Sequence, residues 1–348
     1  MKILSYINKY ALVTVLALGA VVANAQDEEA GGISFSGTVD AYYRANLNGT
    51  NDAGSGLTTA PGTSFANLPG FSLGMINLVT GYEGEKAGFV ADLAFGPRGN
   101  DAVFGSTVGS TPIVNQLYVY WNVSDKLTLT LGNFNTFLGY EVISPAGNFN
   151  YSTSYMFSYG PFSHSGLKAD ISLTDELTFM AAIMNPTDAT DFNPSNDYVG
   201  GFQLGYSNDI GGAWLNGIVS DGFYQVDLTT GWDVTDAIYL GVNATNNSDF
   251  SGAALYAQTS LSDAFALGIR GEYFVDDSGV VLTAGESVLD FTVSANYTVG
   301  GLTFVPEFRI DAASADEFMV EGDPIADPVN VTYSNSLASF VLGAYYSF

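Results

Sequence analysis

The chain has 348 residues, with 36 Asp and Glu against 9 Lys and Arg, so its formal net charge is −27 at pH 7. This acidity excludes a nucleic-acid-binding protein, because the phosphate backbone selects basic surfaces. The chain contains no cysteine, which excludes stabilisation by disulfides and catalysis by a thiol.

The first 25 residues have the features of a cleaved secretory signal peptide. Lys2 and Lys9 precede an apolar run over 11–22, and the small-residue cleavage site "ANA" ends at Ala25. The apolar run is shorter than the about 20 residues of a membrane-spanning helix. We therefore expect an exported chain whose single domain covers residues 26–348.

From residue 33 onward, apolar side chains alternate with small or polar ones. Such a period of two over about ten residues predicts strands with one apolar face, of the length that crosses a bilayer. The abundance of Gly, Tyr and Phe beside only 13% charged residues agrees with strands of this kind. We count sixteen strands, which start near residues 33, 71, 86, 113, 126, 164, 177, 198, 212, 223, 237, 251, 265, 288, 302 and 337.

The connections between these strands alternate in length. Short Asp/Asn/Ser/Gly turns such as "VSDKL" and "LTDEL" alternate with mostly long loops. This pattern predicts an all-β, closed, antiparallel transmembrane barrel with both termini at the periplasmic rim of short turns. A soluble β-sandwich also alternates, but does not require so many strands in one run. The long loops cover residues 46–70, 98–112, 136–163, 186–197, 276–287 and 313–336, with short members near Asp221 and Asn247.

The C-terminal segment "LASFVLGAYYSF" is itself an alternating strand that ends on an aromatic residue. We expect it to pair with the first strand, because closure removes both sheet edges. Its ending is similar to that of outer-membrane barrels, in which the barrel insertion machinery reads a terminal aromatic residue. The resemblance implies that Tyr346 and Phe348 form the insertion signal.

The most distinctive loop lies within "GNFNTFLGYEVISPAGNFNYSTSYMFSYGPFSHSGLK", residues 132–168. It is long, aromatic and poor in charge, so we expect it to be ordered and functional. Its segments N-T-x-x-G-Y-E, N-x-N-Y-S and G-P-x-x-H-x-G resemble the OmpL-like β-barrel porin family. The matching residues are Asn135, Thr136, Gly139, Tyr140, Glu141, Asn148, Asn150, Tyr151, Ser152, Gly160, Pro161, His164 and Gly166.

The resemblance implies a porin whose third long loop folds into the lumen and narrows the pore. We expect the constriction to be lined by the polar residues of this stretch. Glu141 then has two interpretations that the sequence leaves open: it attracts cations to the constriction, or it caps a short helix and holds the loop. The predicted constriction residues are Tyr140, Glu141, Asn148, Asn150, Tyr151, His164 and Lys168.

His164 is the only histidine in the chain. A single imidazole without cysteine does not build a zinc site, and we expect neither a metal nor a cofactor. A Ser-His pairing with Ser163 or Ser165 would make the protein an outer-membrane hydrolase, but it would also need an orienting third group and an oxyanion site. The simpler interpretation is a hydrogen-bonded histidine that fastens the loop to the wall.

Three arginines share the polar face of strands that closure brings together: Arg44, Arg270 and Arg309. We expect them, with Lys168, to face the lumen as a basic wall opposite the loop. The alternative is that they form local ion pairs with the acids of the same face, which are Asp40, Glu272, Glu307 and Asp311. The outer loops are acidic and contain one basic residue, Arg98, which predicts enrichment of cations at the mouth.

The sequence thus predicts a porin of the bacterial cell outer membrane that allows passive diffusion of small hydrophilic solutes and ions, prefers cations and is not an enzyme. Its expected partners are these solutes, outer-membrane lipid, lipopolysaccharide and the insertion machinery, but no nucleic acid. A homotrimer is one possible assembly, because sixteen-stranded porins are often trimers. The alternative function is a plugged structural or interaction barrel that presents acidic surface loops.

Overall fold

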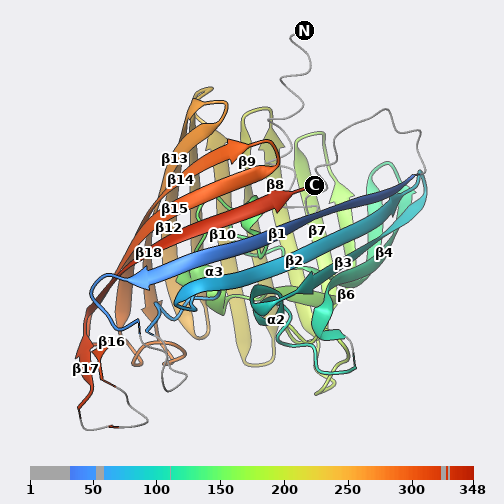
Figure 1. The fold of residues 1–348 in the computed structure, drawn as a ribbon. Coiled ribbons are helices and arrows are strands. Elements are labelled where there is room, and N and C mark those ends of the chain that lie inside the picture. The colour runs from blue at the N-terminus through green and yellow to red at the C-terminus, as the bar shows by residue number, and fades with distance from the viewer. Residues whose placement is uncertain (1–31, 52–58, 110, 323–326, 328–329) are drawn as a thin grey trace.

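The computed structural model describes residues 32–51, 59–109, 111–322, 327 and 330–348. The predicted signal peptide lies outside them. Sixteen strands of the described chain form one closed antiparallel barrel, and each starts within one residue of its predicted start (Figure 1). They are β1 (Ile33–Asn46), β2 (Gly70–Glu83), β3 (Ala87–Phe95), β4 (Val114–Ser124), β5 (Leu127–Asn135), β6 (Ser163–Ser172), β7 (Leu177–Met184), β8 (Val199–Asn208), β9 (Gly211–Ser220), β10 (Phe223–Asp233), β11 (Ile238–Asn247), β12 (Phe250–Ser262), β13 (Phe265–Asp276), β14 (Ser287–Val299), β15 (Leu302–Ala313) and β18 (Ser336–Ser347).

The barrel closes between its first and last strands, as the sequence predicts. Strands β1 and β18 pair from Thr38–Ser347 to Asn46–Ser339. The pairing extends one step further, because Gly37 and Phe348 exchange backbone hydrogen bonds of 3.0 and 3.1 Å. No edge of the barrel is therefore left unpaired at this seam.

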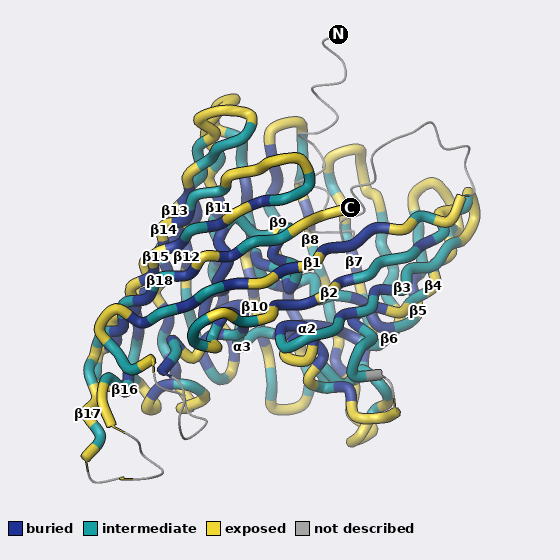
Figure 2. Tube along the Cα trace, viewed as in Figure 1, coloured by how far each residue is buried: buried dark blue, intermediate teal, exposed yellow. Residues whose placement is uncertain are grey.

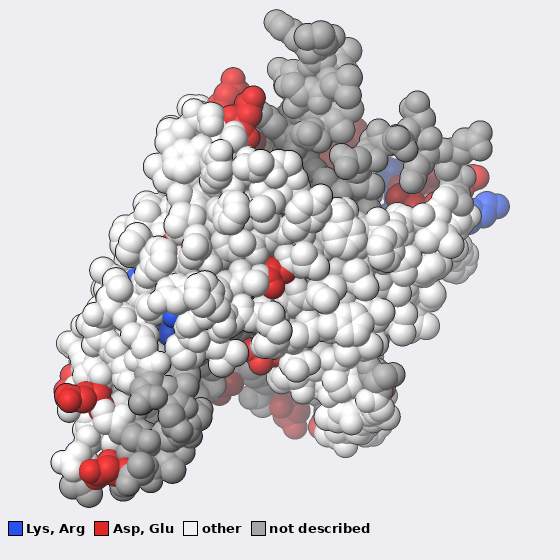
Figure 3. Space-filling view, in the orientation of Figure 1, with Lys and Arg blue, Asp and Glu red and all other residues white. Residues whose placement is uncertain are grey.

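The alternation of side chains sets the inside and the outside of the cylinder. On β15, Thr303, Glu307 and Arg309 are buried towards the lumen, whereas Phe304 and Phe308 are exposed on the outer face. The same alternation runs along the other strands (Figure 2). Figure 3 shows that the outer face around β1, β2 and β18 carries few charged side chains, while acidic groups gather towards the rims. An apolar outer band with polar side chains inside is the arrangement of a membrane barrel.

The long loops contain short elements that the sequence did not predict. These are α2 (Pro97–Ala102), η1 (Thr111–Ile113), η2 (Pro145–Gly147), α3 (Tyr155–Tyr159) and a small sheet of β16 (Phe318–Glu321) and β17 (Thr332–Ser334). Helix α3 begins after Ser154, whose side chain accepts a hydrogen bond from the N–H of Phe157. In the described part of the chain, no helix has the length and hydropathy needed to span a bilayer.

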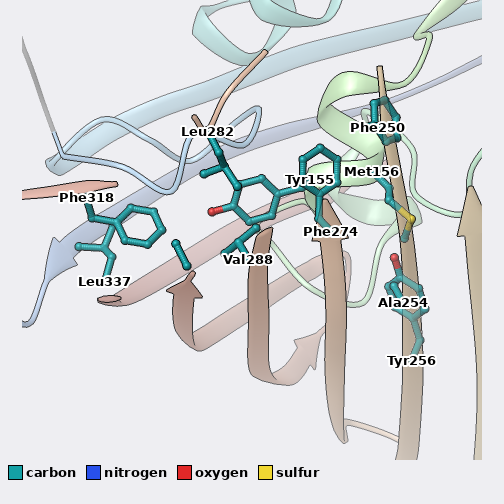
Figure 4. Close-up of a cluster of buried hydrophobic side chains, with 11 residues drawn as sticks. Tyr155, Met156, Phe250, Ala254, Tyr256, Phe274, Leu282, Val288, Phe318 and Leu337 are labelled. Carbon is teal, nitrogen blue, oxygen red and sulfur yellow. The ribbon is translucent and has the colours of Figure 1, made fainter. Parts of the chain in front are cut away.

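The apolar core lies inside the cylinder, between its wall and the third long loop. Tyr155 and Met156 of the loop pack among wall side chains that include Phe250, Phe274 and Val288 (Figure 4). Because these partners belong to β12, β13 and β14, the loop reaches far across the lumen from its ends at β5 and β6. The predicted inward folding of this loop is confirmed.

Candidate functional site

The third outer loop, residues 136–162, is called the lumen loop below. Wall carboxylates hold its main chain. Glu307 accepts hydrogen bonds from the N–H groups of Tyr151 (2.7 Å) and Ser152 (3.2 Å). Glu272 accepts from Tyr155 and Met156, both at 2.8 Å, where α3 begins. Both carboxylates are buried, and these charge-assisted bonds satisfy N–H groups that would otherwise be unpaired.

Two wall arginines hold the carbonyl groups of the same turn. Arg270 Nη1 donates to Ser152 O at 2.8 Å, and Arg309 Nη1 donates to Thr153 O at 2.7 Å. Both guanidinium groups also pair with carboxylates within one charge network. Its ion pairs are Arg270–Glu141 (2.7 Å), Arg270–Asp290 (2.7 Å), Arg309–Asp290 (3.4 Å) and Arg309–Asp311 (2.7 Å). The pair Arg309–Asp311 matches the local ion pairing that the sequence left open as an alternative. Arg270 is also ion-paired, but with Asp290 and with Glu141 of the loop, which that alternative did not name.

Glu141 does not line a water-filled constriction. Its side chain is 3% exposed, one oxygen pairs with Arg270, and the other accepts the N–H of Ser154 at 2.7 Å. Because both oxygens are engaged and buried, its charge is compensated where it lies. Of the two interpretations that the sequence left open, these contacts fit the second, in which Glu141 holds the loop beside α3.

The other predicted constriction residues of the loop divide into two groups. Asn150 and Tyr151 are buried and bond to wall residues, Asn150 to Ser294 and the Tyr151 hydroxyl to Asp40. These two are therefore anchors, and their prediction as solvent-facing residues is wrong. Tyr140 and Asn148 are half-buried, and solvent reaches both.

Solvent reaches the lumen loop mainly at its tip, residues 142–149. Val142, Ser144, Ala146 and Phe149 are half-buried and Gly147 is exposed. The tip is tied to itself, because the Asn148 side chain exchanges hydrogen bonds with the backbone of Val142 at 2.6 and 2.9 Å. This segment, rather than Glu141 or Tyr151, is the edge that the loop presents to water.

Glycines on the inner wall form sockets for the large side chains of the lumen loop. A Cβ at Gly343 would lie 2.2 Å from the Tyr151 ring, and one at Gly268 would lie 2.4 Å from the Phe149 ring. Such distances leave no room for a side chain. The sequence analysis missed these residues, although glycines at inward positions of strand interiors are a signal of close approach. The pairs are Gly201–Phe137, Gly241–Tyr140, Gly252–Met156, Gly268–Phe149 and Gly343–Tyr151.

Arg98 is a further anchor of the lumen loop. It is buried, its Nε donates to Ile143 O at 2.7 Å, and its guanidinium lies 4.3 Å from the centre of the Phe65 ring. The sequence placed Arg98 among the outer loops and did not predict this contact. Its partners come from two other loops, so no local pattern could have identified them.

His164 and Arg44 are also buried and hydrogen-bonded. His164 Nε2 lies 3.0 Å from the Thr136 hydroxyl, and the ring lies 5.1 Å from that of Phe137. The Ser165 hydroxyl donates instead to Asn133 and to Thr190 O. His164 thus fastens the start of the lumen loop to β6, which agrees with the simpler interpretation given above. Its ring is buried and does not line the constriction. Arg44 donates to Thr59 O at 3.0 Å and to Asn46 Oδ1 at 2.8 Å.

Lys168 differs from the arginines because solvent reaches its ion pair. Lys168 Nζ lies 3.0 Å from Asp170 Oδ2, and the two side chains are 17% and 41% exposed. Both residues lie on the inward face of β6, whose outward face presents Leu167. Among the residues predicted to line the constriction, Lys168 is charged and water-accessible.

Comparisons with known proteins agree with this architecture. A family model described as "Putative beta-barrel porin-2, OmpL-like" matches residues 32–348. The chain is similar in fold to OmpT of Vibrio cholerae, with 11% identity, 93% of this chain and 99% of that chain covered, and a TM-score of 0.56. The chain is likewise similar in fold to a trimer form of that protein, with 12% identity and a TM-score of 0.56. The match covers 92% of this chain and 100% of that chain. A mutant of the Rh. blastica porin is similar in fold with 14% identity and a TM-score of 0.55. The match covers 91% of this chain and 100% of that chain. No curated protein matches the chain.

Proposed function

Because the chain belongs to the OmpL-like family of β-barrel porins and lies in the bacterial outer membrane as a sixteen-stranded barrel, we propose that it conducts ions and small hydrophilic solutes by passive diffusion and prefers cations. The lumen loop narrows the passage, so only small solutes pass. Diffusion through water needs no cofactor and no covalent step.

The observation that carries the cation preference is the unequal burial of the two kinds of charge. Arg44, Arg98, Arg270 and Arg309 are all buried and hydrogen-bonded within the protein. The lysines of the described residues are exposed Lys86 and Lys126 in short turns, and partly exposed Lys168. The charge that water reaches is therefore mostly negative.

The outer mouth contributes to the same preference. The described outer loops expose acids such as Asp101, Asp197, Asp277, Asp316 and Glu321, whereas Arg98 of these loops is buried. Acids clustered at a mouth raise the local cation concentration within a Debye length of about 8 Å at physiological salt. Cations then enter the passage more often than anions.

Planar-bilayer recording tests the proposal. Protein shown to be folded by its heat-dependent gel mobility is added to a membrane that separates two potassium chloride concentrations. We expect discrete conductance steps and a reversal potential that is shifted from zero towards the equilibrium potential of potassium. Steps without selectivity would keep the porin and reject the cation preference. The absence of steps from folded protein would reject conduction.

A second candidate function is a closed barrel that displays its outer loops to partners. The observation that favours it is the packing of the lumen by two apolar clusters that both include residues of the lumen loop. One contains Tyr155 and Phe274, and the other contains Phe134, Leu138 and Met184. Liposomes that contain a closed barrel would not swell in any sugar, whereas an open pore admits sugars up to its size limit.

We also propose a homotrimer as the assembly in the membrane. The support is the likeness in fold to a trimer form of the Vibrio cholerae protein. Light scattering of the protein in detergent, corrected for bound detergent, measures its mass. Three times the mass of one mature chain is the expected result, and the mass of one chain would contradict the trimer.

A further inference from the structure

An ion pair on strand β6 differs in its surroundings from the other charges of the inner wall. Lys168 and Asp170 project from the inward face, and Lys168 Nζ lies 5.4 Å from the centre of the buried Phe134 ring. Phe134 belongs to a cluster that includes Leu138 of the lumen loop. The pair therefore lies inside the barrel and not on its lipid face.

In the described residues, the other inward-facing charges between the strand ends are buried. Neutral donors hold some of them: Asp227, for example, accepts from Gly139 N–H at 3.0 Å and from the Asn216 amide at 2.9 Å. Others belong to the charge network. These buried groups are Asp40, Arg44, Asp92, Asp227, Arg270, Glu272, Asp290, Glu307, Arg309 and Asp311. Water reaches these groups far less than it reaches Asp170.

From this contrast we propose that Lys168 and Asp170 form the charge filter of the passage and set its ion selectivity. The inference rests on the proposed function. The Asp170 carboxylate, 41% exposed, is the group that a passing cation meets, and the Lys168 ammonium, 17% exposed, partly offsets it. A charge exposed within a low-dielectric wall acts more strongly on ions than the same charge on an open surface.

The cross-strand neighbours of this pair carry no charge of their own. Across from Lys168 stand Thr130 on β5 and Ala182 on β7, and across from Asp170 stand Thr128 and Met180. All four are uncharged. Replacing Lys168 or Asp170 by a neutral residue therefore changes the charge at this place without releasing another buried partner.

Single neutralisations with matched controls test the charge filter. In a potassium chloride gradient, we expect Asp170→Asn to lower the permeability ratio of potassium to chloride about threefold, and Lys168→Gln to raise it by a similar factor. The controls are Asp175→Asn and Lys126→Gln, which make the same charge changes at exposed turn residues. We expect the controls to shift the ratio much less.

A labelling experiment tests separately whether water reaches the pair. Since the chain lacks cysteine, Asp170→Cys introduces a single thiol. We expect a charged, water-soluble thiol reagent to modify it in folded protein at least tenfold faster than the thiol of Ala254→Cys, a buried inward position. Equal rates, or conducting variants whose selectivity matches that of the controls, would overturn the charge filter and keep the pore. Folded protein without conductance steps would overturn the proposed function and the filter with it.

Discussion

Arg270 on β13 donates to Glu141 of the lumen loop across 2.7 Å, and the two side chains are 0% and 3% exposed. The pair joins residues that lie 129 positions apart in the chain, inside a cylinder whose outer face meets lipid. Because Arg270 also binds Asp290 and the Ser152 carbonyl, it connects the loop to two adjacent strands. The acid that the loop supplies is thus a clamp rather than an ion-binding group.

Glu141→Gln is expected to loosen this clamp. The amide keeps one acceptor but removes the charge that balances buried Arg270, and breaking a buried ion pair costs about 3 kcal/mol. Denaturant unfolding followed by gel mobility measures the loss. Glu321→Gln, at an exposed position of β16, is the control and should unfold like the wild type. Equal losses in both variants would contradict the clamp.

Gly343→Ala is expected to displace the Tyr151 ring from its socket. The added Cβ would lie 2.2 Å from a ring carbon, and overpacking of this kind costs about 1–3 kcal/mol. Proteolysis of the folded barrel should cut the lumen loop faster in this variant. Gly271→Ala is the matched control, because no atom lies within 4 Å of its Cβ position. Unchanged cleavage in Gly343→Ala would show that the loop does not depend on this socket.

Asp188 is expected to make the exit of the lumen loop sensitive to pH. Its Oδ1 accepts from the N–H groups of Phe162 (2.8 Å) and Ser163 (2.9 Å). Burial raises the pKa of Asp188 from 3.8 to about 6, although both hydrogen bonds lower it. The protonated carboxyl is therefore favoured in the folded state. Its contribution to stability is complete below the unfolded pKa and is lost as the pH rises through about 6.

Hydrogen exchange, corrected for intrinsic rates, should accordingly show stronger protection of residues 162–165 at pH 5 than at pH 7.5. We expect Asp188→Asn to remove most of this difference, because the amide does not ionise. Asp197→Asn, at an exposed site of the same loop, should retain it. Persistence of the pH dependence in Asp188→Asn would assign it to another group.

Phe348→Ala is expected to reduce the amount of folded barrel in the outer membrane. The Phe348 ring lies 6.1 Å from that of Phe35, and its backbone already pairs with Gly37. The variant keeps the backbone pairing, so a low yield in cells together with normal refolding in detergent would indicate a lost insertion signal. Normal yield in cells would remove Phe348 from that role.

The strands could be predicted because membrane and water impose a period of two on every one of them. The predicted starts near 33, 177, 223 and 265 coincide with the first residues of β1, β7, β10 and β13. The inward position of Arg270 follows from the same parity. Alternation is a local property, so it can be detected from neighbouring residues of a single sequence even when the distant contacts are unknown.

The interior of the barrel could not be predicted in the same way. That Glu141 meets Arg270, or Arg98 meets Ile143, depends on where a long loop crosses the lumen. The local sequence around a polar residue in such a loop is the same whether the side chain faces water or a buried partner. The sequence therefore identified the loop but grouped Glu141, Asn150, Tyr151 and His164 with the constriction, whereas the structure buries all four. The holding roles of Glu141 and His164 were among the interpretations that the sequence left open.

Tyr151 lies across the seam of the cylinder. Its hydroxyl bonds to Asp40 on β1, its ring fills the space left by Gly343 on β18, and its N–H is bound by Glu307 on β15. The first and last strands of the barrel, β1 and β18, thus both contact the side chain of Tyr151, a residue from the middle of the sequence. A barrel that closed without the loop inside would leave Asp40 and Glu307 without these donors. We therefore expect closure of the cylinder and burial of the loop to be coupled during assembly.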